Sequence, residues 1–147
     1  LVEKLKELVI PSGPLYGEIK NNEKVETAEF GTLYRKDFVG PDQPGKIITI
    51  MGDTRYNENF TSFVKDSDLL VHEATFNHDQ AELAKQYFHS TTKQAATLAK
   101  ESNVKQLIIT HISSRYQYND GRLLEQEARE IFPNTILAND FYHQKIE

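Results

Sequence analysis

The chain has 147 residues, with 38% hydrophobic and 27% charged side chains, which suits one globular domain and argues against disorder. Its 17 basic and 22 acidic residues give a net charge of −5, which argues against non-specific binding of nucleic acid but leaves room for a local basic cluster. The absence of cysteine excludes disulfide scaffolds, thiolate zinc sites, iron–sulfur clusters and cysteine nucleophiles, so any metal must be held by His, Asp or Glu.

The first 45 residues predict short elements joined by loops. Residues 1–10 are amphipathic and carry four charged side chains, which is typical of the end of a helix and excludes a signal-peptide core. The chain starts inside this pattern without methionine, which fits either a segment of a longer protein or a cleaved tag. The segment PSGPLYG at 11–17 predicts a loop or turn. Residues 24–39 predict one or two short strands, and GPDQPG at 40–45 predicts a second loop.

From residue 46 onward, apolar runs alternate with helical patterns. Runs such as KIITIM and KQLIITHI are rich in β-branched residues, which indicates buried strands. The segments between the runs have helical periodicity, and Ser90 or Thr91 can cap one of the helices. We therefore predict an α/β layer with a mostly parallel sheet. The predicted strands lie near 46–51, 68–73, 105–111 and 135–139, and the predicted helices near 60–65, 79–88, 91–102 and 120–132.

No apolar run in the sequence approaches the ~20 residues that a membrane-spanning helix needs. We therefore expect no membrane partner. The lack of a signal-peptide core and of cysteine further predicts a cytoplasmic protein.

Side chains that can bind a metal stand at the predicted carboxyl ends of three strands. Asp53 follows the first strand and His111 follows the third. The pair His72–Glu73 ends the second strand. In a parallel sheet these ends share one edge, where α/β proteins bind their ligands. Each residue also has a structural interpretation: Asp53 as the cap of a turn, His111 as a core histidine, and Glu73 as a partner of buried backbone groups.

The segment FHSTT at 88–92 places His89 directly before a predicted helix. A helix start offers free N–H groups and the positive end of the helix dipole, so it is a ready phosphate site, to which Ser90 and Thr91 would add hydroxyl donors. The alternative is simple N-capping by Ser90 or Thr91, which leaves no role for His89. The sequence has no H-E-x-x-H motif, no Ser–His–Asp spacing and no glycine-rich nucleotide loop.

Five motifs in this order resemble the ribonuclease Z family: PSGPLYGEIK, ITIMGDTR, LLVHEATF, YFHSTTKQAATLAKE and LIITHISSRYQ. That family contains the zinc-dependent endoribonucleases of the metallo-β-lactamase superfamily that trim the 3′ ends of precursor tRNA. The resemblance covers nearly all of residues 1–147 and implies one half of the αββα sandwich of the superfamily. It implies the carboxyl-terminal half, because the hallmark H-x-H-x-D-H, which supplies most zinc ligands and the general base, is absent from the chain.

The resemblance implies roles for four residues. Asp53 of GDT matches the aspartate that bridges both zinc ions, and His111 of THIS matches a terminal zinc ligand. His89 of HST matches the histidine that gives a proton to the departing group, and Glu73 of HEAT matches its orienting partner. Arg115 stands four residues after His111, where it can clamp a phosphate through two hydrogen bonds.

The complete enzyme is expected to hold two zinc ions, to act on precursor tRNA and to form a homodimer, while this chain alone is expected to be inactive. One alternative is a non-catalytic half-domain, because Asp53 and His111 are too few ligands for a stable dinuclear site. The other alternative is a different phosphodiesterase of the same superfamily, against which the motifs FHSTT and THISSRY argue.

Overall fold

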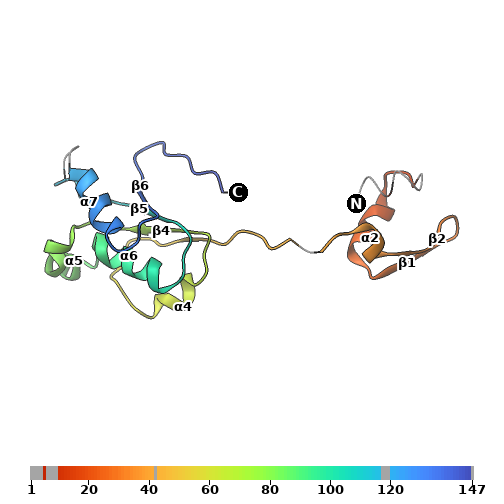
Figure 1. Ribbon diagram of the computed structural model, residues 1–147, viewed down its shortest axis with the longest axis horizontal. Helices are drawn as coiled ribbons and strands as arrows, with labels where there is room; N and C mark the ends of the chain where they lie inside the picture. The colour runs from red at the N-terminus through yellow and green to blue at the C-terminus, as the bar shows by residue number, and fades with distance from the viewer. Residues whose placement is uncertain (1–4, 6–9, 42, 117–119, 147) are drawn as a thin grey trace. The chain divides into compact units, whose positions relative to one another are not determined.

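The structure is a computed structural model that describes residue 5 and residues 10–41, 43–116 and 120–146. Contacts divide the chain into two compact units, Leu1–Pro44 and Gly45–Glu147, although the length suits one domain. Each unit has its own cluster of buried hydrophobic side chains. Figure 1 labels α2, β1 and β2 of the first unit, and α4 to α7 and β4 to β6 of the second.

The amino-terminal unit combines a hairpin with short helices. Strands β1 (Lys24–Thr27) and β2 (Gly31–Tyr34) pair antiparallel, which confirms the strands predicted within 24–39. Helices α2 (Pro14–Asn21) and α3 (Arg35–Phe38) precede and follow the hairpin. Among the described residues of this unit, the buried hydrophobic side chains are Leu5, Ile10, Ile19, Leu33 and Phe38.

Helix α2 corrects the prediction of a loop over residues 11–17, because the helix begins at Pro14. Proline suits the first position of a helix, since its fixed φ matches helical geometry and its missing N–H needs no partner there. In the sequence, both prolines of this segment indicate a break in regular structure. Pro14 instead stands at the start of a helix, where proline is favoured.

The carboxyl-terminal unit is built on a four-stranded sheet with the strand order β3-β4-β5-β6, and all neighbouring strands are parallel. Its strands are β3 (Ile48–Ile50), β4 (Leu69–Glu73), β5 (Leu107–Thr110) and β6 (Thr135–Leu137). This arrangement confirms the predicted α/β layer. Each strand lies within its predicted range and is shorter than it.

Each α-helix of this unit lies within a helix that the sequence predicts, and the 3-10 turn η1 begins one residue before the helix predicted at 79–88. The helices are α4 (Phe60–Val64), η1 (His78–Gln80, a 3-10 turn), α5 (Ala81–Tyr87), α6 (Thr92–Glu101) and α7 (Asp120–Arg129). Within the described ranges, no helix is long and apolar enough to cross a membrane.

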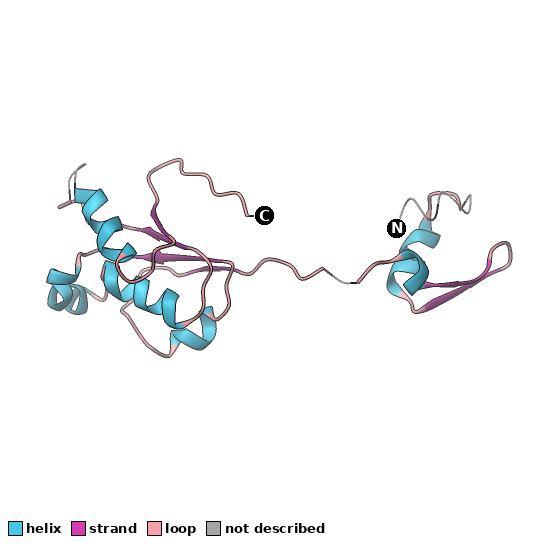
Figure 2. Cartoon of the chain, in the orientation of Figure 1, coloured by secondary structure: helices cyan, strands magenta, loops and turns pink. Residues whose placement is uncertain are grey.

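The two faces of the sheet differ in what covers them. Leu70 and Leu107 point to the same face, where they pack in one core with buried residues of α4, α6 and α7. On the opposite face, Ile48 and Ile50 of β3 are 50% and 72% exposed, whereas Leu69 and Ile108 are 5% exposed. Figure 2 shows the strands in magenta and the helices in cyan. The exposed apolar residues of this face are therefore those of β3.

Candidate active site

Three loops at the carboxyl ends of β3, β4 and β5 bring the candidate residues together. Asp53 lies three residues beyond the end of β3, Glu73 is the last residue of β4, and His111 follows β5 directly. Because these strands are parallel and adjacent, their ends meet at one edge. His89 joins the group from the segment between α5 and α6.

Asp53, His89 and His111 form one compact cluster. Asp53 Oδ2 lies 3.4 Å from His111 Nε2, and one ligand atom from each of the three residues lies within 4.8 Å of the others. The imidazole rings of His89 and His111 are stacked, with 5.2 Å between their centroids. The structure therefore shows the convergence that the strand ends predict, while the role of each residue stays a prediction.

The backbone at His111 is strained. Its φ of +57° lies in the left-handed region, which is uncommon for residues other than glycine and costs roughly 1–2 kcal/mol. This conformation turns the chain sharply at the end of β5. The turn places the imidazole beside Asp53 instead of letting it continue along the strand direction. Strain of this kind is common at functional sites.

Glu73 lies beneath the cluster and is 1% exposed. Its Oε1 accepts hydrogen bonds from the backbone N–H of Ser90 at 2.8 Å and of Thr54 at 3.3 Å, and it lies 3.0 Å from His89 Nδ1. Its Oε2 accepts from the N–H and the hydroxyl of Thr75, at 2.8 and 2.9 Å. A buried carboxylate needs such partners, and here they tie the loops of the site together.

Sequence reasoning identifies Glu73 but misses Thr54 and Thr75, which hold it. Thr75 also contacts His111, since its Oγ1 lies 2.9 Å from His111 Nδ1. These bonds join segments far apart in the sequence, and nothing in the periodicity of the chain marks them. The only available signal was the position of Thr75 two residues after a predicted site carboxylate, where a hydroxyl can bond back to it.

Ser90 and Thr91 are buried and have partners within the chain. Ser90 Oγ donates to the Thr54 carbonyl at 2.7 Å. Thr91 caps helix α6 through a reciprocal pair of hydrogen bonds with Gln94. The N–H groups of Ser90, Thr91 and Thr92 are bonded to Glu73, Gln94 and Phe76. These amides therefore do not face outward as the phosphate interpretation of this helix start expects.

Arg115 is exposed and lies near the cluster, across the ring of Phe76. Its guanidinium is 5.1 Å from the Phe76 centroid and donates a hydrogen bond to Gln80 Oε1 at 2.9 Å. The Phe76 ring in turn meets the His89 ring edge-on, with 6.1 Å between centroids. The guanidinium is thus held by weak surface contacts and retains donors for a further partner.

His72 lies outside the cluster, although it is adjacent to Glu73. Successive strand residues point to opposite faces, so His72 faces the core while Glu73 faces the site. The imidazole is fully buried, and burial lowers the pKa of His72 below its ordinary value. Its Nδ1 lies 2.6 Å from the Glu73 carbonyl oxygen. A neutral core histidine accounts for these observations.

The donor set of the cluster fits a metal ion. It offers one carboxylate and two imidazoles, with no thiolate, and such ligands suit zinc or manganese. The side chains of Asp53 and His111 are 58% and 48% exposed, so metal ligands from another segment can reach the same point.

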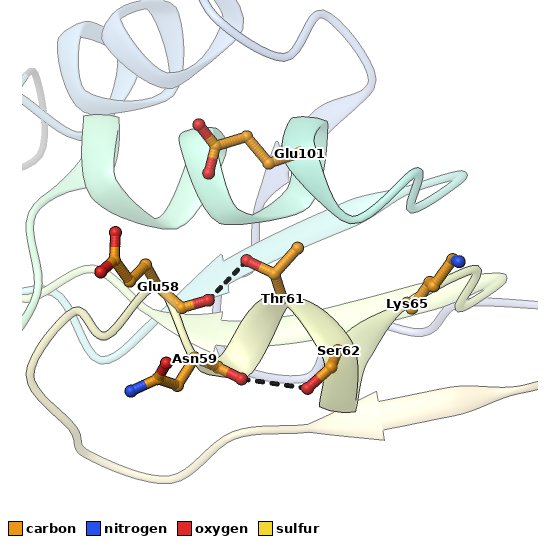
Figure 3. Close-up of a pocket in the computed structure, with 6 residues that line it drawn as sticks. All are labelled: Glu58, Asn59, Thr61, Ser62, Lys65 and Glu101. Carbon is orange, nitrogen blue, oxygen red and sulfur yellow. Dashed lines mark hydrogen bonds between the residues drawn. The ribbon is translucent and has the colours of Figure 1, made fainter.

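A pocket of about 500 Å³ lies apart from the cluster, between α4 and α6 (Figure 3). Its lining residues are Glu58, Asn59, Thr61, Ser62, Lys65 and Glu101.

Comparison with known proteins identifies close relatives. The chain is 50% identical over 141 residues to "Ribonuclease Z" of Lactobacillus acidophilus, 52% identical over 141 residues to that of Oceanobacillus iheyensis, and 51% identical over 140 residues to that of Bacillus cereus. These matches cover 95–96% of this chain. Over nearly its whole length, this chain is similar to about half of a ribonuclease Z protein. It spans about half the length of these relatives, since it covers 45–46% of each.

Solved structures agree with this similarity to ribonuclease Z, and they identify the fold of the chain. Human tRNase Z, short form, is 31% identical with a TM-score of 0.52, over 76% of this chain and 35% of that chain. The metallo-β-lactamase fold protein YhfI from Bacillus subtilis is 26% identical with a TM-score of 0.58, over 65% and 38% of the two chains. The chain therefore has part of a metallo-β-lactamase fold. No family model matches it.

Proposed function

We propose that the protein to which this chain contributes is a zinc-dependent endoribonuclease that removes 3′ trailers from precursor tRNA by phosphodiester hydrolysis. The observation that carries this proposal is the cluster of Asp53, His89 and His111 above the buried Glu73, in a chain about half identical to ribonuclease Z proteins over nearly all its length. In this proposal, residues 1–147 are the carboxyl-terminal half of the domain and are inactive alone.

Asp53 and His111 are the proposed metal ligands of this chain. A carboxylate has two oxygens, so Asp53 can offer one to each of two zinc ions, and His111 offers Nε2, which already faces Asp53. The remaining ligands come from a segment with the H-x-H-x-D-H motif. Two zinc ions bound here would supply an activated water and positive charge for the phosphodiester transition state.

His89 is the proposed proton donor to the leaving 3′ oxygen. Its Nδ1 is directed at Glu73 and its ring is stacked against that of His111, so its other nitrogen is free of these contacts. Glu73 fixes the ring orientation, because its own position is set by three backbone amides and one hydroxyl. The sequence comparison favours this chemistry over a half-domain without catalytic function.

Arg115 is the proposed phosphate-binding residue, because its exposed guanidinium is close to the cluster. Ser90 and Thr91 enter the same proposal through their position beside His89, and each would have to exchange an internal hydrogen bond for one to phosphate. The proposal further includes precursor tRNA as the substrate, a homodimer as the assembled form and the cytoplasm as the location.

Reconstitution tests the proposed function. The chain is mixed with the part of Lactobacillus acidophilus ribonuclease Z that it does not match, and precursor tRNA and Zn²⁺ are added. We expect cleavage at the 3′ end of the tRNA body by the mixture and by neither part alone. Cleavage should disappear with Asp53→Ala and persist with Glu82→Ala, a control that removes an exposed carboxylate of α5. A mixture that forms a complex and binds zinc but leaves precursor tRNA intact would overturn the proposal.

A further inference from the structure

The hydroxyl of Thr75 connects the buried carboxylate of Glu73 to His111, a proposed metal ligand. We propose that Thr75 is a positioning residue that keeps the proton of His111 on Nδ1 and so leaves Nε2 free as a metal ligand. This inference rests on the proposed metal site. It adds a residue and a role that neither the resemblance nor the strand-end pattern indicates.

The side chain of Glu73 accepts hydrogen bonds and donates none. Three backbone N–H groups, those of Thr54, Ser90 and Thr75, donate to its two oxygens. These donors suit an ionised carboxylate, which accepts hydrogen bonds and has no proton to give. Glu73 therefore acts only as an acceptor. His89 Nδ1, 3.0 Å from Oε1, must then carry a proton and donate it.

The hydroxyl of Thr75 contacts both Glu73 and His111. A threonine hydroxyl has one proton, and that of Thr75 is given to Glu73 Oε2 at 2.9 Å. The contact between Thr75 Oγ1 and His111 Nδ1, also 2.9 Å, therefore needs its proton from the histidine. The proton of neutral His111 then resides on Nδ1. Its Nε2 is an unprotonated nitrogen with a lone pair.

The unprotonated Nε2 of His111 faces the carboxylate of Asp53. Nε2 of His111 lies 3.4 Å from Asp53 Oδ2, so two acceptor atoms face one another with no proton between them. Such a pair is mutually repulsive without a cation and well arranged for one, because neutral imidazole nitrogen and carboxylate oxygen are both zinc ligands. The hydrogen bonds beneath the site thus set the form in which its ligands are presented.

One buried carboxylate consequently orients both histidines of the cluster. Glu73 holds His89 directly through Oε1 and holds His111 indirectly through Oε2 and the Thr75 hydroxyl. The backbone of Thr75 is fixed independently, because its N–H donates to Glu73 and its carbonyl accepts from Ser113 N–H at 3.0 Å. Replacing Thr75 by valine removes the hydroxyl while keeping both backbone bonds and nearly the same volume.

The tautomer of each histidine in the metal-free, full 147-residue chain tests the inference. Nitrogen-15 NMR of the ring nitrogens at pH 8 distinguishes Nδ1–H from Nε2–H. We expect His111 to be Nδ1–H in the parent chain and in Thr75→Ser, and a mixture of both forms in Thr75→Val. His89 should stay Nδ1–H in Thr75→Val, since its bond to Glu73 does not involve Thr75. Thr135→Val, which removes another buried hydroxyl, should change neither histidine.

Zinc affinity gives the functional readout without any RNA. Groups that orient a metal-ligating histidine typically contribute 10–100-fold to metal affinity. We expect Thr75→Val to raise the Kd of the chain for Zn²⁺ by about that factor, and Thr75→Ser to restore it. The inference is overturned if His111 in the parent chain carries its proton on Nε2, or if Thr75→Val leaves the tautomer unchanged. Neither result depends on cleavage of precursor tRNA, so the proposed function is tested separately.

Discussion

At the amino end of the parallel sheet, Asp68 is surrounded by partners of opposite charge. Its Oδ1 binds Lys105 Nζ at 2.7 Å with Lys46 Nζ at 3.8 Å, and its Oδ2 accepts the Ile47 N–H at 2.8 Å. At the carboxyl end, Asp53 lies 3.4 Å from His111 and, within the described residues, forms no ion pair with a lysine or arginine. One carboxylate has lysine partners within the chain, and the other lies beside imidazole rings.

The comparison shows how one sheet separates stability from function. A carboxylate that is paired with lysines of the same chain stabilises the fold, and its oxygens are already occupied by these partners. A carboxylate left without a lysine or arginine contributes little to the fold, and a cation supplied from outside gains the interaction. The amino end of the sheet therefore serves folding, and the carboxyl end serves the proposed chemistry. The predictions below test this division, from the largest expected effect to the smallest.

Replacing Asp53 by alanine should abolish cleavage by the reconstituted enzyme. The side chain is the one carboxylate of the cluster, so its loss removes an oxygen ligand for the proposed zinc ions. Because Asp53 is exposed and makes few contacts, the free energy of unfolding should change by less than about 0.5 kcal/mol. Single-turnover assays and urea unfolding measure both quantities. Cleavage at a near-parental rate would show that Asp53 is not a metal ligand.

Replacing His89 by alanine should lower turnover by about 10²–10⁴-fold, the usual contribution of a positioned proton donor, while zinc content stays normal. The loss should shrink on a substrate whose leaving group needs no proton. His143→Ala, which removes an exposed histidine, is the control and should leave turnover unchanged. A drop in zinc content together with turnover would instead make His89 a metal ligand, which its place in the cluster also allows.

Leu70→Ala tests the covered face of the sheet. In contrast to Asp53→Ala, this substitution should lower the stability of the fold and leave turnover per folded molecule unchanged. Leu70 is fully buried in the core beneath α6, so its truncation should cost about 2–5 kcal/mol in the free energy of unfolding. Turnover per folded molecule should stay near that of the parent. Urea unfolding and activity normalised to the folded fraction provide the test, and a stable variant with poor turnover would contradict the division proposed above.

The sequence predicts the strand-end residues of the site better than the hydrogen bonds that hold them in place. Strand runs followed by Asp53 and His111 are local patterns, and parallel topology is enough to bring them to one edge. The contacts that hold Glu73 depend largely on where loops meet after folding, so the periodicity of the chain marks neither Thr75 nor Thr54. The same limit applies to Ser90. Its place at a predicted helix start indicates a hydroxyl that could bind phosphate, but in the structure this hydroxyl donates to the Thr54 carbonyl.

The smallest effect concerns Asp68 and appears as a dependence of stability on pH. The hydrogen bond from Lys105, then that from the Ile47 N–H, holds the pKa of the Asp68 carboxyl below its ordinary value of 3.8. A carboxyl with a lowered pKa in the folded state stabilises the protein above its unfolded pKa, and this contribution disappears as pH falls through the folded pKa. Asp68→Asn should therefore unfold at a lower urea concentration than the parent at pH 6.

The difference between Asp68→Asn and the parent should narrow below about pH 4, near the pKa of an unfolded aspartate, and vanish once Asp68 is protonated in both states. High salt should also narrow it at pH 6, because the pairs with Lys46 and Lys105 are at the surface. Asp66→Asn, a neighbouring exposed carboxylate that accepts from Asn103, is the control. Equal pH profiles for the two variants would mean that the lysines around Asp68 do not stabilise the amino end of the sheet.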